Sequence, residues 1–84
     1  MHIVFTRHSE KKFKDLKKLG VTIKKSFVKN VLKNPLHIDN ESDPPKKIAS
    51  GKFGKKHILR IVFREENDII IVITFYPAKK GRYF

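Results

Sequence analysis

The chain has 84 residues and carries 20 Lys and Arg against eight Asp and Glu, a formal net charge of +12. A chain of this length holds one hydrophobic core and buries only about 60–65% of its unfolded surface, so we expect residues 1–84 to form a single domain of modest stability. The charge favours a polyanionic partner over an acidic small-molecule pocket. The lack of cysteine excludes a disulfide scaffold, a cysteine-ligated zinc site and a thiol nucleophile.

The apolar segments are too short to cross a bilayer. The longest, residues 69–73, is far below the roughly 20 residues that a membrane helix needs. Residues 1–7 lack the basic and then apolar pattern of a secretory signal, so we expect a cytoplasmic protein that contacts no membrane. The four histidines lack metal-ligand spacing, and we expect neither a metal nor another cofactor.

The N-terminal residues predict a strand that leads into a helix. Residues 2–6 are rich in β-formers and end at Thr6, which is a suitable helix N-cap. Residues 7–19 then place apolar side chains at helical spacing, and Gly20 is positioned to end this helix in the left-handed conformation.

A second helix is predicted over residues 23–34. Thr22 is a suitable cap for it, and its apolar positions fall on one face. Pro35 ends it, because proline lacks the N–H group and disfavours helix in the residue before it.

The second half of the chain predicts strands. Residues 36–45 indicate a loop, residues 46–56 a short strand with a glycine-containing turn, and residues 57–64 and 69–76 a hairpin joined by a polar connection. The predicted fold is therefore α+β, in the order β-α-α-β-β-β, with an antiparallel sheet and both N-terminal helices packed on one face.

The hairpin also predicts a register. A turn centred on residues 66–67 would pair Arg60 with Ile73 and His57 with Tyr76, and it would put Arg60 and Phe75 on the same face. Both faces of the pair are mainly apolar, so we expect the two strands to lie in the middle of the sheet rather than at its edge. The pattern leaves open which face the helices cover.

The positive charge is concentrated in two regions. Residues 7–33 hold ten Lys and Arg against two acids, and residues 79–84 are basic with two aromatic side chains. Basic patches with aromatics suit nucleic acid, although a solvated helix face and a frayed tail are the alternatives. Any catalytic groups would be Lys, Arg, Tyr and His, a set that fits metal-free phosphodiester cleavage.

Three motifs of the second half point to a known family. Leu-Arg-Ile-Val-Phe at residues 59–63 is followed by a β-rich run at 69–74 and by Lys-Lys-Gly-Arg-Tyr-Phe at 79–84. This succession, like the β-α-α-β-β-β order, resembles toxins of the RelE/ParE superfamily. Residues 5–8 and 31–35 are similar to a small uncharacterised branch of it.

The resemblance implies the toxin of a type II toxin–antitoxin system. RelE-like toxins enter the ribosomal A site and cleave mRNA, with the 2′-hydroxyl attacking the adjacent phosphate to leave a cyclic phosphate and a 5′-hydroxyl. The implied partners are a small antitoxin protein, the ribosome and mRNA.

The resemblance also implies roles for individual residues. Arg60 matches the arginine that contacts the scissile phosphate, Arg82 (or Lys80) the one that stabilises the transition state, and Tyr83 the C-terminal tyrosine that stacks on or activates the nucleotide. The residues expected to bind RNA phosphates are Lys46, Lys47, Lys52, Arg64, Lys79 and Lys80.

Three other interpretations remain open. Arg60 can instead have a structural role, paired with a loop acid such as Asp39 or Glu41. The whole chain can be a ParE-like toxin, which inhibits DNA gyrase without chemistry. It can also be a non-catalytic RNA-binding module that uses only the Lys-rich helix.

Overall fold

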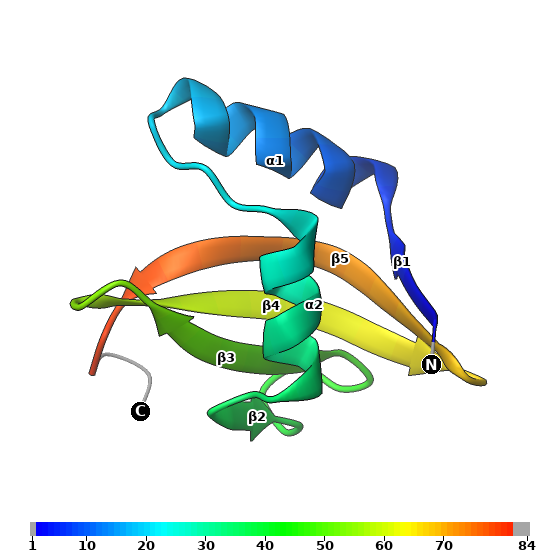
Figure 1. Cartoon of the computed structure of the whole chain (residues 1–84). Helices are drawn as coiled ribbons and strands as arrows, with labels where there is room; N and C mark the ends of the chain where they lie inside the picture. Colours follow the sequence, from blue (N-terminus) through cyan, green and yellow to red (C-terminus); the bar gives the residue numbers. More distant parts are fainter. Residues whose placement is uncertain (1, 82–84) are drawn as a thin grey trace.

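The computed structural model describes residues 2–81, which form a five-stranded mixed sheet with two helices (Figure 1). The elements, in chain order, are β1 (His2–Phe5), α1 (Arg7–Lys18), α2 (Lys25–Lys33), β2 (His37–Asp39), β3 (Lys47–Phe53), β4 (His57–Glu66) and β5 (Ile69–Lys79). The α+β class is as predicted from the sequence. The order is β-α-α-β-β-β-β, with one strand more than predicted.

The additional strand, β2, lies in the segment predicted as a loop. It pairs antiparallel with β3, from His37 opposite Ser50 to Asp39 opposite Ile48. The three residues of β2 are largely exposed, with Ile38 at 41%. A strand this short has no alternation of buried and exposed residues that a sequence pattern could detect.

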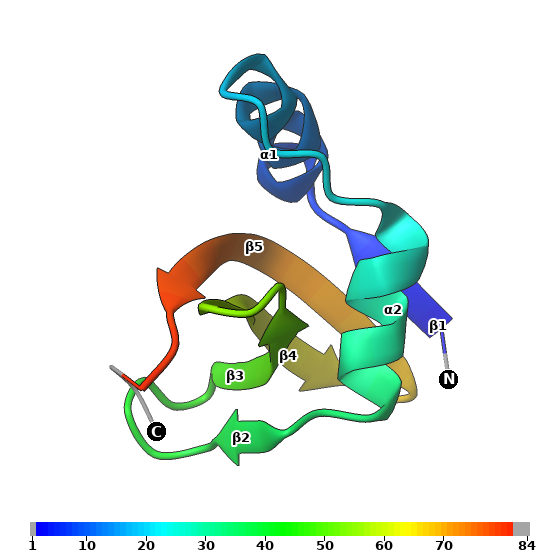
Figure 2. The ribbon, with the colours of Figure 1, turned by 60° about the vertical axis from the view of Figure 1, so that its left-hand side comes forward.

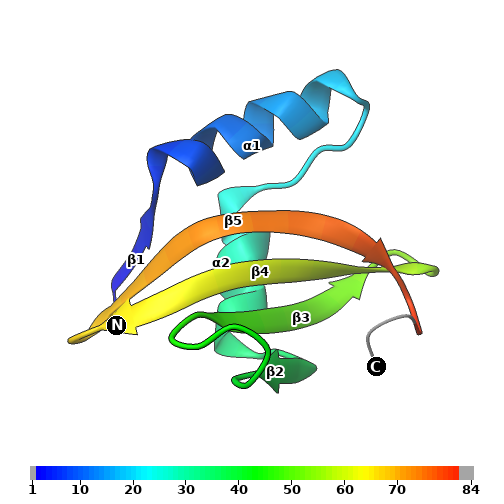
Figure 3. The ribbon, with the colours of Figure 1, turned by 180° about the vertical axis from the view of Figure 1, so that it is seen from behind.

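The sheet is mixed rather than antiparallel, which corrects the prediction. Its strand order is β1-β5-β4-β3-β2, and β1 runs parallel to β5 from His2 opposite Ile69 to Phe5 opposite Val72. Strands joined by hairpins must alternate in direction, but β1 leads into helices and is free of that constraint. Figure 3 shows β1 beside β5 at one edge and β2 at the other.

The start and end of α1 follow local sequence signals. Thr6 caps the helix, because its Oγ1 accepts a hydrogen bond from the backbone N–H of Ser9 at 3.1 Å. The same hydroxyl donates to the carbonyl oxygen of Ile73 at 3.1 Å, which ties the start of α1 to β5. Gly20 follows the helix with a φ of 83°, so both predicted boundary residues are confirmed.

Helix α2 starts later than predicted. Its N-cap is Lys24, without a side-chain capping bond, so Thr22 is not the cap. The delay places Ile23 in the link between the helices, where it is only 6% exposed and belongs to the core. The helix ends at Lys33 with Asn34 as its C-cap, one residue before the predicted end. No helix within residues 2–81 is both long enough and apolar enough to span a membrane.

Both helices bury their apolar faces in one core on one face of the sheet. The ring of Phe13 from α1 lies 4.5 Å from that of Phe75 on β5 and 5.6 Å from that of Phe5 on β1. From α2, Val28 and Val31 join the same cluster as Ala49, Leu59, Ile61, Phe63 and Val72 of the sheet. Figure 2 shows α1 above β5 and α2 alongside the strands. Each fully buried aliphatic side chain contributes about 1.5–3 kcal/mol.

The register of the β4–β5 hairpin differs from the prediction in two ways. The turn is two residues, Asn67 and Asp68, so Glu66 pairs with Ile69; Asn67 has a φ of 57°. A shift between Val62 and Phe63 then leaves Ile73 as an extra residue on β5, a β-bulge.

The bulge reverses the alternation of side chains beyond Ile73. Arg60 therefore faces Tyr76 rather than Ile73, and His57 faces Lys79 rather than Tyr76. The prediction that Phe75 shares a face with Arg60 is therefore wrong, because Phe75 belongs to the core on the helix side.

Gly51 of β3 permits the close approach of α2. A Cβ atom at this position would lie 2.5 Å from Cγ2 and 2.8 Å from Cγ1 of Val31, well inside van der Waals contact. The strand and the helix would have to separate to accommodate it.

We predict that Gly51→Ala lowers the free energy of unfolding by about 1–3 kcal/mol, because the added methyl overpacks this contact. Urea unfolding monitored by circular dichroism measures the loss. In a Val31→Ala background the same substitution should cost clearly less, since the clashing methyls are gone. An equal cost in both backgrounds would show that the contact with Val31 is not the cause.

Candidate functional site

A row of polar side chains crosses the sheet face that the helices leave open. The strand register aligns His37 of β2 with Ser50 of β3, Ser50 with Arg60 of β4, and Arg60 with Tyr76 of β5. Their chain neighbours Ala49, Leu59, Ile61 and Phe75 belong to the core under the helices. Because successive side chains in a strand point to opposite faces, the polar row lies on the other face. We call this surface the open face.

Arg60 is the central charged group of the open face. It is only 7% exposed, and its neighbour Ser50 is 2% exposed. Its guanidinium carbon lies 5.7 Å from the centre of the Tyr76 ring, within the range of a cation–π interaction. Burying a guanidinium costs desolvation free energy. Because the surrounding residues enclose the Arg60 side chain, its charge is held at one place, unlike the charge of a flexible surface lysine.

Asp39 brings a carboxylate to the same face, two residues beyond His37 on β2. It accepts hydrogen bonds from the Ser42 hydroxyl and, through Oδ1, from the backbone N–H groups of Glu41 at 2.9 Å and Ser42 at 3.0 Å. The Ser42 hydroxyl is the main cause of a lowering of the Asp39 pKa to about 2, followed by the two N–H groups. The positive charge of Arg60 lowers it further, as the smallest contribution.

The low pKa determines what Asp39 can do. It remains a carboxylate at neutral pH and does not serve as a proton donor there. Its bonds close the start of the β2–β3 loop, and its charge partly balances Arg60. The positive charge of Arg60 contributes to the low pKa of Asp39, and the predicted ion pair between these two residues stays a prediction.

The predicted phosphate-binding residues divide between the two faces. By strand alternation, Lys52 and Arg64 lie on the open face with Arg60. The charge of Arg64 is offset by an ion pair with Glu66. Lys52 is exposed and lies diagonally across from Arg60, which corresponds to a separation of about 7–8 Å.

The other predicted residues lie elsewhere. Lys47 and Lys79 have the alternation of the helix side, and Lys47 forms an ion pair with Glu65 at 3.0 Å. Lys46 precedes β3 and lies 3.7 Å from Asp43. Lys80 follows β5 and is exposed. The two remaining predicted catalytic residues, Arg82 and Tyr83, lie outside the described residues.

Three members of the row, His37, Ser50 and Tyr76, were not among the predicted site residues. Tyr76 was missed because the predicted register paired it with His57, and the bulge at Ile73 carries no clear sequence signal. His37 was missed because β2 was predicted as a loop. The Asn67-Asp68 pair was the one available signal, since Asn tolerates the left-handed conformation of a two-residue turn.

Residues 2–81 include no group of three or more His, Asp or Glu side chains arranged to hold a metal ion. The chemistry available on the open face is that of a fixed guanidinium, a second cation, a phenol and an imidazole. Groups of these kinds are able to bind a phosphodiester and to stabilise negative charge.

The chain matches no protein-family model, no curated protein and no solved structure in the comparisons with known proteins.

We predict that the Asp39 carboxyl titrates with a pKa of about 2, and that Ser42→Ala raises this pKa toward the ordinary 3.8. The physical reason is the loss of the hydroxyl that stabilises the carboxylate. Carboxyl-carbon NMR over an acid titration measures both values, and Ser26→Ala on the exposed side of α2 is the matched control.

The same shift has a consequence for stability. Because the folded pKa lies below the unfolded one, the stabilisation from Asp39 is present above about pH 4 and is lost as the pH falls toward 2. The melting temperature of Asp39→Asn should therefore fall less than that of the parent over this window. Parallel acid dependences for the two proteins would contradict this account.

Proposed function

We propose that this chain is a RelE-like type II toxin, an endoribonuclease that cleaves mRNA on the ribosome without a metal and is neutralised by a small antitoxin protein. The observation that carries the proposal is the buried Arg60 at the centre of the open face, set against Tyr76 and accompanied by Lys52. The net charge of +12 and the family resemblance of residues 59–63, 69–74 and 79–84 support it.

Arg60 binds the scissile phosphate in this proposal. The planar guanidinium presents several N–H donors in a fork that fits two phosphate oxygens at once. The 2′-hydroxyl oxygen attacks phosphorus and loses its proton to a base, while the bond to the 5′-oxygen breaks and that oxygen gains a proton. The products are a 2′,3′-cyclic phosphate and a 5′-hydroxyl. Arg60 stabilises the negative charge that accumulates on the phosphate oxygens.

Tyr76 and Lys52 support that role in different ways. The Tyr76 ring lies against the guanidinium and restricts its orientation, so Tyr76 is a positioning residue. Lys52 is diagonal to Arg60 on the same face and binds a neighbouring phosphate of the RNA.

The proton transfers are assigned to groups other than Asp39, whose carboxyl stays ionised. His37 lies two strands from Arg60 in the same row, roughly 10 Å away, and imidazole is the commonest general base in enzymes. By the resemblance, Arg82 stabilises the leaving group and Tyr83 stacks on the nucleotide. These two roles remain predictions.

A ParE-like inhibitor of DNA gyrase is the second candidate. One observation favours it: Asp39, which lies on the same face as Arg60, is held ionised, so it supplies no acid for the leaving group. In that case the open face binds protein and performs no chemistry.

We predict that primer extension on an mRNA translated in a purified system reveals new 5′ ends at A-site codons in the presence of this protein. Arg60→Ala should lower the cleavage rate by about 10²-fold or more, the usual cost of removing one group that stabilises transition-state charge. Tyr76→Phe, which keeps the ring, should retain more activity than Tyr76→Ala. Arg82→Ala tests the role assigned by the resemblance.

Two lysine substitutions on β3 distinguish the effect of the proposed site from the effect of net charge. Lys52→Ala, on the open face, should reduce cleavage about tenfold, the cost of one lost charged hydrogen bond. Lys47→Ala removes the same charge from the opposite face and should leave cleavage unchanged once its melting temperature has been checked. Intact mRNA with the parent protein would refute the nuclease proposal, and inhibition of gyrase supercoiling by the same preparation would establish the second candidate.

A further inference from the structure

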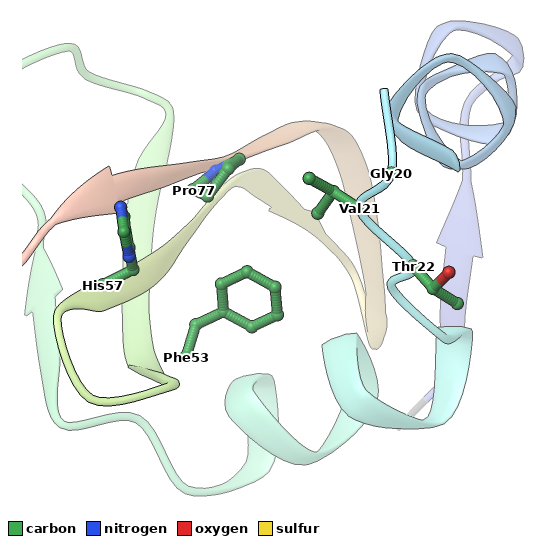
Figure 4. A pocket seen from close by; sticks show the side chains of 6 residues that line it. All are labelled: Gly20, Val21, Thr22, Phe53, His57 and Pro77. Atoms are coloured by element: carbon green, nitrogen blue, oxygen red, sulfur yellow. The ribbon is translucent and has the colours of Figure 1, made fainter. Parts of the chain in front are cut away.

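An apolar pocket opens on the helix side of the molecule, at the end of the sheet where β3 meets β4. It has a volume of about 340 Å³ and lies between the link that joins α1 to α2 and the ends of three strands. Its lining residues are Gly20, Val21, Thr22, Phe53, His57 and Pro77. Figure 4 shows Val21 of the link and Pro77 of β5 on the same side of the pocket, with the Phe53 ring below them.

The pocket is firmly built. Phe53, which forms its floor, is held by the Phe27 ring of α2 at 5.8 Å. Gly20, on the link, is fixed by the hydrogen bond from its N–H to the carbonyl oxygen of Lys17 at 3.0 Å. Its walls are mostly apolar, and the polar side chains among its lining residues are those of Thr22 and His57.

Exposed lysines follow or precede every segment that forms the pocket. Two end α1 before Gly20, one follows Thr22, two precede His57 and two follow Pro77: Lys17, Lys18, Lys24, Lys55, Lys56, Lys79 and Lys80. The backbone N–H of Lys80 donates to the carbonyl oxygen of Lys56 at 2.7 Å, which joins the β3–β4 turn to the end of β5. We call these seven residues the lysine rim.

The lysine rim has no acidic residue within its own segments. Residues 16–24, 52–57 and 75–81 contain neither Asp nor Glu. Six of the eight acids lie in residues 39–43 and 65–68, and the β4–β5 turn that includes 65–68 is at the opposite end of the sheet (Figure 1). The charge around the pocket is therefore not balanced from within these segments.

We propose that this pocket docks an acidic polypeptide segment, which inserts one apolar side chain such as Leu or Phe and sets its carboxylates against the lysine rim. The apolar walls reward burial of an apolar anchor. The rim complements the acids beside the anchor and steers the segment to the site. A nucleobase fits less well, because its polar edges would meet the side chains of Val21, Phe53 and Pro77.

This docking site is independent of the proposed RNA cleavage. The pocket residues Phe53, His57 and Pro77 have the alternation of the helix side, whereas Arg60 and Tyr76 lie on the open face. Either proposal can fail without the other.

Binding can be tested with three fluorescent probes and the full chain. The first is a short glutamate-rich peptide with a central Leu-Phe pair, the second is the same peptide with Ala-Ala in place of that pair, and the third is a single-stranded oligouridine. Fluorescence anisotropy should show the Leu-Phe peptide binding about tenfold or more tightly than the Ala-Ala peptide, since only the first fills the pocket.

Two substitutions locate the binding. Val21→Glu places a charge in the pocket wall. It should lower the affinity for the Leu-Phe peptide by about tenfold and the affinity for the Ala-Ala peptide by less. Lys56→Glu, in the exposed β3–β4 turn, should weaken both peptides. Lys33→Glu makes the same charge change at the far end of α2, where Lys33 lies beside His2 and Ile3 of β1 rather than at the pocket, and it should lower the affinity for both peptides much less.

Several results would overturn the proposal. Equal binding of the two peptides would show attraction by charge alone, and equal effects of Lys56→Glu and Lys33→Glu would show that the lysine rim is not the site. Oligouridine binding that is tighter than peptide binding and lost in Val21→Glu would assign the pocket to nucleic acid. The primer-extension assay on Val21→Glu should give the parent's cleavage, so a failure of one proposal is distinguishable from a failure of the other.

Discussion

The hydroxyl of Thr6 donates a hydrogen bond to the carbonyl oxygen of Ile73 and accepts one from the N–H of Ser9. One side chain thereby caps α1 and fixes that helix against β5 at the position of the β-bulge. The bulge changes which side chains of β5 reach each face: Phe75 turns into the core against Phe13, and Tyr76 turns out beside Arg60. The packing of the core and the composition of the open face therefore depend on the same irregularity.

The two faces of the sheet differ in what they bury: apolar side chains on the helix side and a charged side chain on the open face. The helix side is an ordinary apolar core, with Gly51 providing the room for Val31 and α2. The open face keeps Arg60 nearly buried, at 7% exposure, next to an aromatic ring and in the field of the ionised Asp39. A cation held in this way pays its ordering cost during folding, so it can meet a phosphate without a further loss of side-chain freedom.

Positive and negative side chains are unevenly distributed along the molecule as well as between the two faces of the sheet. Ion pairs offset several lysines and arginines, including Lys25 with Glu10 at 2.6 Å and Lys47 with Glu65. The lysine rim lies away from the two loops that carry most of the acids. The two proposals therefore concern two separate surfaces, one centred on the guanidinium of Arg60 and one on the apolar pocket.

Local signals were sufficient for the class of fold and for most element boundaries. The rules for helix caps and helix ends identified Thr6, Gly20 and Asn34, because each of these residues affects only the backbone next to it in the chain. The composition predicted an anionic partner, and the β-rich run around Arg60 placed this arginine on an inner strand. The sequence by itself thus determined the α+β elements, the basic character and the central position of Arg60.

The tertiary structure decided which residues share a face. Lys47 and Lys52 are five residues apart and therefore point to opposite sides of β3, but only the packing of the helices decides that Lys52 is the one on the open face. Tyr76 reached Arg60 only through the bulge, and His37 joined the row only because a three-residue segment found an edge of the sheet to pair with. The pocket combines the helix link with residues from three strand ends. These outcomes depend on register and on contacts between residues far apart in the chain, and a shift of one residue moves a side chain to the other face of the sheet.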